Sequence, residues 1–267
     1  MKTIYYYQTF IGLDKLLTHI EDIDVIIVSS IHFDKLNGQA QIYLNDNLPN
    51  DKLFDELWMQ THKASVQNTT IMLMVGGAGG AYAELFSDFD RNYKLLKDLL
   101  EEKDWIGGID LDIEESVKIS DVKMLILRLI TDFGDNFIIT MAPVASSLQN
   151  DGGSMGGFNY KELYQSKEGT YIKWFNTQCY NSFSKDTFKS IIKNGYPPEK
   201  IVMGMESGQF DKNTFKTALK VVQQLNKAYP DMGGVYDWEY LNAPPSTTDP
   251  SLWARIFKNN VIRIKED

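Results

Sequence analysis

The chain has 267 residues, a formal net charge of −9 and 43% hydrophobic residues, and it contains no block of basic residues. This acidic balance argues against nucleic acid and anionic membrane surfaces as partners. The single cysteine, Cys179, excludes an intrachain disulfide.

The first ten residues, MKTIYYYQTF, contain one lysine followed by an aromatic run. They lack the long apolar segment and the small-residue cleavage site of a secretory signal peptide. No apolar run in the chain approaches the roughly 20 residues that cross a membrane as a helix. We therefore expect a cytoplasmic protein, or the mature form of a secreted one, that does not contact a membrane.

Short apolar segments alternate along the chain with longer amphipathic segments. The short segments predict strands at Thr3–Tyr7, Asp24–Ser29, Thr70–Val75, Gly108–Ile113, Phe137–Ala142, Trp174–Tyr180, Lys200–Met205 and Gly233–Trp238. The longer segments predict helices that include Asp51–Ser65, Asp90–Glu102, Ser120–Phe133, Ser184–Asn194, Asn213–Ala228 and Ser251–Asn259. We expect Asp90, Ser120 and Asn213 to cap their helices, because short polar side chains accept hydrogen bonds from the free N–H groups of a first turn.

Strands that alternate with helices in this way predict parallel strands joined by helical crossovers. Eight such units in 267 residues match a (β/α)8, or TIM, barrel. A doubly wound sheet is the alternative. In a barrel, the loops Val144–Gly157 and Asn242–Pro250 follow strands and lie on the C-terminal face, where active sites are found.

The predicted strand at Gly108–Ile113 leads into three acidic residues that share one face. Side chains alternate along a strand, so Asp110, Asp112 and Glu114 point one way and the aliphatic residues between them point the other way. Carboxylates that lie close together repel one another, so the pKa of at least one should rise. Such an arrangement is more typical of a catalytic site than of a structural strand. A solvated acidic edge strand is the alternative.

This strand resembles the active-site strand of family-18 glycoside hydrolases, the chitinases and endo-β-N-acetylglucosaminidases. Their pattern is D-x-x-D-x-D-x-E, and here the last three acids match in G-G-I-D-L-D-I-E, which begins at Gly107. Other similar motifs follow the expected order along the chain: M-V-G-G ending at Gly77, T-M-A-P ending at Pro143, Q-C-Y-N at Gln178–Asn181 and G-V-Y-D-W ending at Trp238. The resemblance covers nearly the whole chain. It implies a single catalytic (β/α)8 barrel domain over residues 1–267, without a large inserted domain.

The resemblance also implies the chemistry of the acidic residues. Glu114 would be the general acid that protonates the glycosidic oxygen. Asp112 would orient the substrate's own N-acetyl group, whose oxygen attacks the anomeric carbon to give an oxazolinium ion, with net retention of configuration. Asp110 would support Asp112 from deeper in the barrel. Tyr180 would donate a hydrogen bond to the acetamido oxygen. The alternative for Tyr180 is a core tyrosine.

Further residues would form the sugar pocket. Trp238 would be its floor, because apolar sugar faces stack on indole rings; a core tryptophan is the alternative. Met141 and the backbone around Ala142 would line the same pocket. The other candidates for substrate binding lie at strand ends: Tyr6, Gln8, Gly77, Gln178, Asn181 and Glu206. Cys179 would then point away from the pocket as a buried small hydrophobe.

Two positions differ from the family pattern. Gly107 stands where the family has its first aspartate, and Met74 stands where it often has a serine. Both family residues hydrogen-bond behind the acidic pair. We expect Met74 to fill the space that Gly107 leaves empty, and the carboxylate relay to end at Asp110.

We considered other chemistry for the same residues. The acids could bind magnesium, which favours carboxylate ligands. The glycines at Gly76–Gly80 do not fit a phosphate-binding motif. His19, His32 and His62 are scattered in the sequence, so we expect no zinc site. The resemblance implies no cofactor.

The sequence therefore predicts a chitinase-like glycoside hydrolase that cleaves β-1,4 bonds in glycans containing N-acetylglucosamine. An endo-β-N-acetylglucosaminidase acting on N-glycans is the first alternative. A non-catalytic chitin-binding lectin on the same fold is the second. The joint presence of Asp112, Glu114 and Tyr180 favours an enzyme over a lectin. We expect the protein to be a monomer.

Overall fold

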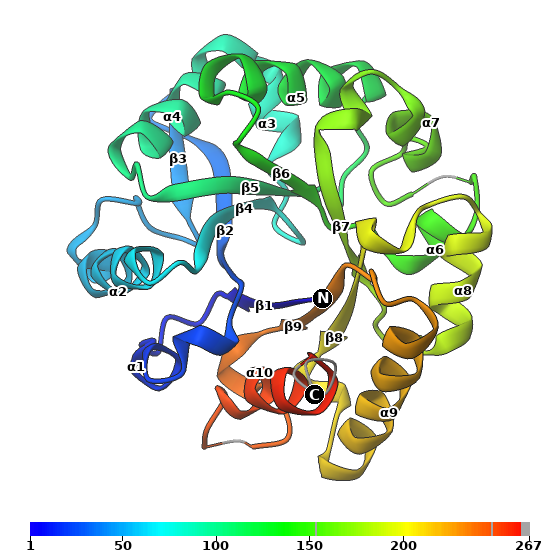
Figure 1. The fold of residues 1–267 in the computed structure, drawn as a ribbon. Helices are drawn as coiled ribbons and strands as arrows, with labels where there is room; N and C mark the ends of the chain where they lie inside the picture. Colours follow the sequence, from blue (N-terminus) through cyan, green and yellow to red (C-terminus); the bar gives the residue numbers. More distant parts are fainter. Residues whose placement is uncertain (153, 247, 263–267) are drawn as a thin grey trace.

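The computed structural model describes residues 1–152, 154–246 and 248–262. Within these residues, eight parallel strands form a closed barrel in the order β1, β2, β4, β5, β6, β7, β8 and β9. β1 closes the barrel because it pairs with β2 on one side and β9 on the other. Figure 1 shows this ring of strands with the helices around it. The predicted TIM barrel is confirmed, and the doubly wound sheet is not observed.

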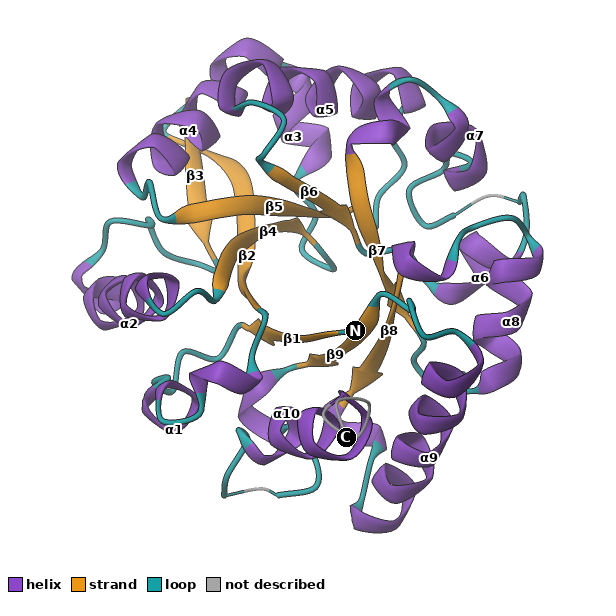
Figure 2. Cartoon of the chain, viewed as in Figure 1, coloured by secondary structure: helices purple, strands orange, loops and turns teal. Residues whose placement is uncertain are grey.

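The barrel strands are β1 (Lys2–Tyr7), β2 (Val25–Leu36), β4 (Thr70–Gly76), β5 (Ile106–Asp112), β6 (Ile138–Met141), β7 (Ile172–Gln178), β8 (Ile201–Glu206) and β9 (Gly234–Trp238). The helices are α1 (Asp14–Leu17), α2 (Asp55–Val66), α3 (Tyr82–Ser87), α4 (Phe89–Glu102), α5 (Ile119–Phe133), α6 (Ala145–Gln149), α7 (Tyr160–Gln165), α8 (Lys185–Lys193), α9 (Lys212–Ala228) and α10 (Leu252–Phe257). Figure 2 shows the helices outside the ring of strands. Each predicted strand and helix overlaps an observed one.

One strand of the described residues was not predicted from the sequence. β2 continues past the barrel and pairs in antiparallel fashion with β3 (Gln39–Leu44). The two strands are joined by Asn37-Gly38, and both residues have positive φ angles, 52° and 77°. Such two-residue turns match the twist of a β-hairpin, and Asn-Gly favours them. The hairpin extends one wall of the barrel on the side where β2 ends.

The predicted helix caps were wrong by two residues. Asp90 and Ser120 lie inside the first turns of α4 and α5. Asn213 lies inside α9, whose cap is Asp211: its carboxylate accepts hydrogen bonds from two backbone N–H groups at 2.8 Å. At α9, Asp211 and Asn213 are both suitable caps, and the sequence pattern alone does not decide between them. The residues at the cap positions of α4 and α5, Asp88 and Lys118, make no side-chain cap hydrogen bond.

The predicted loop Val144–Gly157 is partly helical, because α6 occupies its first half. Residue 153 of this loop and residue 247 of the predicted loop Asn242–Pro250 lie outside the described residues.

The core has two layers, because side chains alternate between the inside and the outside of the barrel. The apolar residues of the inner layer come from several strands: Ile4, Tyr6, Val25, Ile27, Met72, Met74, Trp174, Val202 and Tyr236. The larger outer layer lies between the strands and the helices. Cys179 is buried in this outer layer, as predicted.

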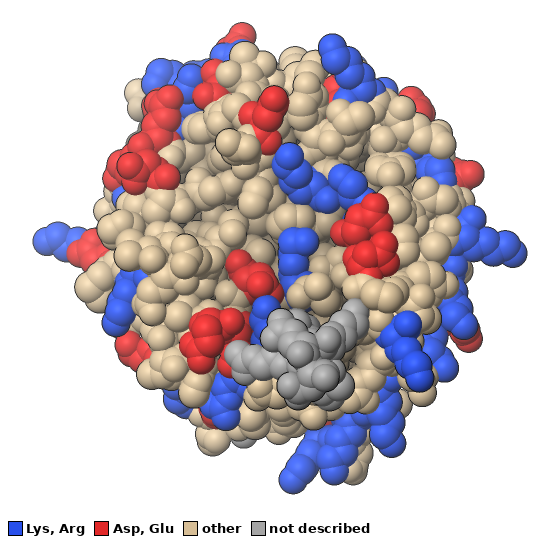
Figure 3. Space-filling model, in the orientation of Figure 1, with Lys and Arg blue, Asp and Glu red and all other residues tan. Residues whose placement is uncertain are grey.

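Acidic and basic side chains are interspersed over the face of the molecule shown in Figure 3. No helix within the described ranges is long and apolar enough to span a membrane.

Candidate active site

A pocket of about 260 Å³ opens at the end of the barrel where the strands finish. Seven of the residues predicted for catalysis or substrate binding line it: Gln8, Gly77, Asp112, Glu114, Gln178, Tyr180 and Trp238. They come from β1, β4, β5, β7 and β9 or from the residues that follow these strands. Parallel strands bring their carboxyl ends to one face of a barrel, so residues up to 230 positions apart meet there.

Asp110 lies beneath this pocket and is fully buried. Its carboxylate accepts hydrogen bonds from Tyr6 Oη at 2.7 Å, Thr140 Oγ1 at 2.5 Å and Asn176 Nδ2 at 3.0 Å. Burial raises the pKa of Asp110, and the three hydrogen bonds oppose that rise. The donors come from three other strands, so they hold the side chain in one position.

Asp112 is the most strongly perturbed acid at the pocket. The residue is only 6% exposed. Burial raises its pKa well above the usual range, and the negative charges of Glu114 and Asp110 raise it further. A hydrogen bond from Gln178 Nε2 to Asp112 Oδ1, at 3.2 Å, opposes the rise. The predicted increase in a carboxyl pKa therefore falls on Asp112, and also on Asp110.

This perturbation predicts how stability depends on pH. Above the ordinary pKa of 3.8, the unfolded chain ionises at Asp112 while the folded protein keeps the proton. At pH values below 3.8, both states hold the proton, and Asp112 makes its full contribution to the free energy of unfolding. That contribution falls as pH rises toward the folded pKa, because only the unfolded chain then loses the proton. We expect Asp112→Asn to melt at a progressively higher temperature than wild type as pH increases. Thermal melts from pH 4 to pH 8 measure this difference, with the exposed Asp186→Asn as control; a constant difference would contradict it.

Glu114 lies two residues after the end of β5 and is half-buried at the pocket. The Gln178 amide links it to Asp112, because Nε2 lies 3.2 Å from an oxygen of each carboxylate. The same nitrogen lies 2.9 Å from the carbonyl oxygen of Ala142. An amide has only two N–H bonds, so these three acceptors share them. Gln178 thereby holds the two carboxylates side by side.

Two aromatic residues form another part of the wall. Trp238 is half-buried, and its ring packs at 5.3 Å from the ring of Tyr6. Tyr180 is also half-buried, and its hydroxyl accepts a hydrogen bond from Tyr236 Oη at 3.2 Å. Because Tyr236 supplies that proton, the Tyr180 O–H remains able to donate to a bound molecule.

Some predicted residues occupy other places. Tyr6 does not line the pocket but donates to Asp110 behind it. Gln8 does line the pocket. Glu206 does not line it, and accepts a hydrogen bond from Gln209 instead. Ala142 contributes its carbonyl oxygen to Gln178.

Two predictions about substrate binding need correction. Met141 is fully buried in the outer layer, because its neighbour Thr140 takes the inward position on β6. Asn181 is exposed and has a φ of 55°, so the chain turns at this residue and its side chain does not reach the pocket. Its backbone N–H donates to Gln209 at 2.7 Å.

The expected relation between Met74 and Gly107 is also wrong. A Cβ placed on Gly107 would have only Thr70 Cγ2, at 3.8 Å, and Ile71 O, at 4.0 Å, within 4 Å. Met74 therefore does not fill space beside Gly107. It lines the pocket instead, where its Sδ lies 3.6 Å from Ser29 Oγ. The pairing of β4 with β5 shifts register just before Met72, which changes the face that Gly107 presents.

The sequence interpretation missed two supports of Asp110, namely Thr140 and Asn176. Both could have been found from alternation along the strand. Asn176 lies two residues before Gln178, so it shares the inward face that was assigned to Gln178. Thr140 lies in the quoted T-M-A-P motif, and Met141 beside it was taken as the inward residue.

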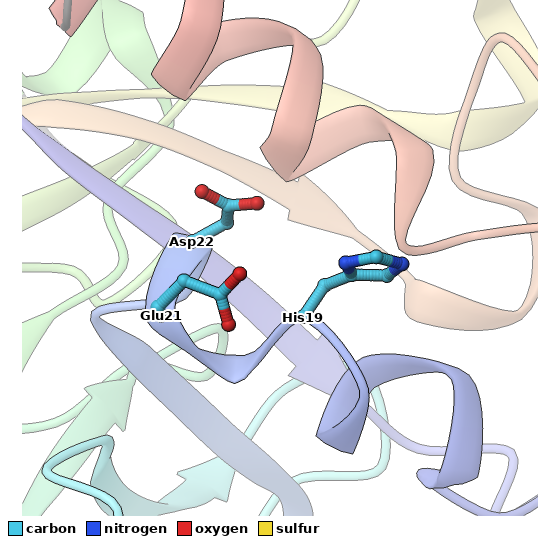
Figure 4. A group of neighbouring side chains, drawn as sticks. All are labelled: His19, Glu21 and Asp22. Carbon is cyan, nitrogen blue, oxygen red and sulfur yellow. The ribbon is translucent and has the colours of Figure 1, made fainter.

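A separate group of possible metal ligands lies outside the pocket. His19, Glu21 and Asp22 each offer one atom within 4.8 Å of the others, and Glu21 is exposed. Figure 4 shows these side chains at the short helical turn that precedes β2. This turn lies at the opposite end of the barrel from the strand ends that form the pocket. A metal ion held there would not contact Asp110, Asp112 or Glu114.

Comparison with known proteins was consistent with this geometry. The family described as glycosyl hydrolases family 18 matches residues 2–250. A search of curated proteins gave no match.

The chain is similar to solved structures over nearly its full length. A fungal endo-β-N-acetylglucosaminidase of glycosyl hydrolase family 18 is 29% identical, with a TM-score of 0.86 over 98% of this chain and 99% of that one. The chitinase ChiC from Aspergillus fumigatus is 30% identical, with a TM-score of 0.83 over 97% and 98%. A family-18 chitinase from Pseudoalteromonas aurantia shares the fold at 18% identity, with a TM-score of 0.72 over 97% and 100%.

The family match, the barrel and the acidic pocket agree with one another: the chain belongs to family 18 of the glycosyl hydrolases, and it is a glycoside hydrolase.

Proposed function

We propose that the protein hydrolyses β-1,4 bonds beside N-acetylglucosamine in chitin or chito-oligosaccharides, and that the substrate's own acetamido group is the nucleophile. The observation that carries this proposal is the pair of Asp112 and Glu114, held side by side by Gln178 within one small pocket. The similarity to a family-18 chitinase and to a family-18 endo-β-N-acetylglucosaminidase supports the substrate class.

In this mechanism Glu114 protonates the oxygen of the scissile bond as the bond breaks. It is half-buried at the pocket, so a bound glycan can reach it. After the leaving group departs, the same carboxylate takes a proton from water as that water attacks the anomeric carbon. The two displacements occur on opposite faces of the sugar, so configuration is retained.

Asp112 acts on the acetamido group rather than on the sugar carbon. Its carboxyl accepts a hydrogen bond from the amide N–H and turns the amide oxygen toward the anomeric carbon. An ionised Asp112 also stabilises the positive charge of the oxazolinium ion. The pKa of Asp112 is raised in the free protein. A bound substrate that develops positive charge beside Asp112 lowers this pKa and so favours loss of the Asp112 proton.

Tyr180 and Trp238 fit the other requirements of this reaction. The Tyr180 hydroxyl has a free O–H, which can donate to the acetamido oxygen. The half-buried indole of Trp238 offers an apolar surface for one face of the sugar ring. Asp110 is fixed by its three donors beneath the pocket, where its charge helps to raise the pKa of Asp112.

The first alternative is an endo-β-N-acetylglucosaminidase acting on N-glycans. The similarity to the fungal enzyme of that name, with its TM-score of 0.86, favours it. Both reactions use the same acid and the same acetamido nucleophile, so they differ only in what lies beyond the reacting sugar.

We also propose that residues 1–267 act as a single catalytic domain and as a monomer. All the residues of the pocket come from one chain, so no second copy is needed to complete it. Light scattering during size-exclusion chromatography tests the oligomeric state.

The test of the reaction uses fluorogenic chitobioside and chitotrioside, together with a high-mannose glycopeptide. Release of product from the chito-oligosaccharides identifies a chitinase, whereas release of glycan from the glycopeptide alone identifies the endo-β-N-acetylglucosaminidase. Binding of chito-oligosaccharide without turnover would support the lectin instead.

Substrate assistance has its own test. The same glycosides with a free amine in place of the acetamido group cannot form the oxazolinium ion. We expect their hydrolysis to fall by about 10³-fold or more, because an intramolecular nucleophile has a high effective concentration. Equal rates on both substrates would exclude this mechanism.

A further inference from the structure

Glu115, the residue directly after the proposed acid, points away from the pocket and makes hydrogen bonds of its own. Its Oε1 accepts from the backbone N–H groups of Ala81 and Tyr82, both at 2.5 Å, and its Oε2 accepts from Ala83 N–H at 3.1 Å. These three groups are at the start of α3. Glu115 therefore joins the chain that follows β5 to the chain that follows β4.

The segment that leads into α3 is part of the pocket wall. Gly76, Gly77, Ala78 and Gly79 all line the pocket. Gly76, Gly77 and Gly80 have φ angles of 95°, 83° and 69°, a region of backbone conformation that favours glycine. A wall made almost entirely of backbone has few side chains to hold its shape. It depends on contacts from neighbouring elements.

Three neighbouring parts of the chain hold the glycine segment (Gly76–Gly80) or the residues directly after it. Gly77 N–H donates to the carbonyl oxygen of Asp112 at 2.9 Å. His32 Nδ1 lies 2.7 Å from the carbonyl oxygen of Gly80. Glu115 holds the residues directly after Gly80. Of these contacts, only the one from Glu115 comes from a side chain adjacent in sequence to the proposed acid.

We infer that Glu115 is a positioning residue, which fixes Glu114 relative to the glycine segment and hence to the sugar bound against it. The three backbone N–H groups bonded to the Glu115 carboxylate restrict the position of residue 115. Because Glu114 is joined to residue 115 by a peptide bond, its main chain is restricted too. This inference rests on the proposed function of Glu114. General acid catalysis needs the carboxyl within hydrogen-bond distance of the glycosidic oxygen, so a shift of about 1 Å has a large effect on rate.

The alternative is that Glu115 only caps α3 and contributes stability. Ala81, at the cap position, has no side-chain hydrogen bond to the helix, so Glu115 does serve as the cap. The chain offers a matched control for that effect. Asp211 accepts hydrogen bonds from two backbone N–H groups at the start of α9, and it does not line the pocket.

The experiment compares Glu115→Ala, Glu115→Gln and Asp211→Ala with wild type, measuring thermal melts, kcat and KM on the fluorogenic chito-oligosaccharides. Assays are run well below all four melting temperatures. We expect Asp211→Ala to lower the melting temperature and leave kcat and KM unchanged. We expect Glu115→Ala to lower kcat about 10-fold or more, with KM within about threefold of wild type.

Glu115→Gln should recover much of the lost kcat, because its amide oxygen can still accept the two shortest hydrogen bonds. A kcat for Glu115→Ala equal to that of wild type would overturn the inference. A rise in KM alone would also overturn it, since the residue would then hold only the wall.

Amide hydrogen exchange of residues 77–83 separates this inference from the proposed function. Glu115→Ala should speed this exchange, and Asp211→Ala should not. If wild type neither cleaves nor binds the glycans, the proposed function fails, while faster exchange in Glu115→Ala would still support the contact on which the inference depends. Unchanged exchange would overturn the inference whatever the activity.

Discussion

Replacing Glu114 by glutamine should remove nearly all hydrolysis while leaving the fold intact. The amide has almost the same shape as the carboxyl but cannot give a proton to the glycosidic oxygen, and general acid catalysis contributes roughly 10²–10⁴-fold. The Gln178 amide can still donate to the oxygen of the new side chain, so the local contact that Glu114 makes at 3.2 Å is retained. We therefore expect kcat to fall by about 10³-fold on chito-oligosaccharides, whose leaving group is a sugar hydroxyl that needs the proton, with binding of the product chitobiose little changed.

The control for this variant is Glu199→Gln, an exposed glutamate that precedes β8 at the other end of the barrel. It makes the same chemical change and should leave the rate as it is. The thermal melt of Glu114→Gln should stay close to that of wild type. Turnover equal to wild type would remove Glu114 as the acid and refute the mechanism.

Asp112→Asn should give the second large loss of activity. Asparagine can accept a hydrogen bond from the acetamido N–H but carries no charge to stabilise the oxazolinium ion. Removing one preorganised electrostatic contact to a developing charge costs about 10²–10³-fold in kcat. Because this contact strengthens only as the charge forms, we expect the loss in kcat and little change in KM.

The Asp112→Asn variant also separates the roles of the two acids. With an activated leaving group such as a nitrophenol, protonation by Glu114 matters less, so Glu114→Gln should regain part of its rate and Asp112→Asn should not. Steady-state kinetics on the nitrophenyl and oligosaccharide substrates measure this difference. Equal recovery in both variants would contradict the assignment of separate roles. The control is Asp186→Asn, which makes the same chemical change at an exposed aspartate.

Alternation along single strands accounts for most of what could be predicted. The inward face of β5 places Asp110 and Asp112 beneath and at the pocket, and the same rule places Gln178 inward and Cys179 outward on the segment that includes the end of β7. This rule works because the side-chain period of a strand is fixed by backbone geometry. It fails where the period is interrupted, as at Asn181, where the chain turns with a positive φ angle.

The β2–β3 hairpin shows a different limit. Its Asn37-Gly38 turn was present in the sequence, and this dipeptide favours the turn that the structure has. The strand predicted at Asp24–Ser29 stops before this turn, whereas β2 continues to Leu36. The hairpin matters for the site because His32, on its β2 strand, lines the pocket and contacts Gly80.

The sequence by itself determined the barrel, because strands alternate with helices along the chain, and the acids of the pocket, because side chains alternate within one strand. Only the tertiary structure decided which of the inward-facing residues, and which residues outside the strands, support those acids. Tyr6 reaches Asp110 across 104 positions of the chain, and Glu115 reaches Ala81 across 34. Contacts of this kind depend on the register between strands and on side-chain rotamers. No local pattern specifies either one, because both are set by how the whole barrel packs.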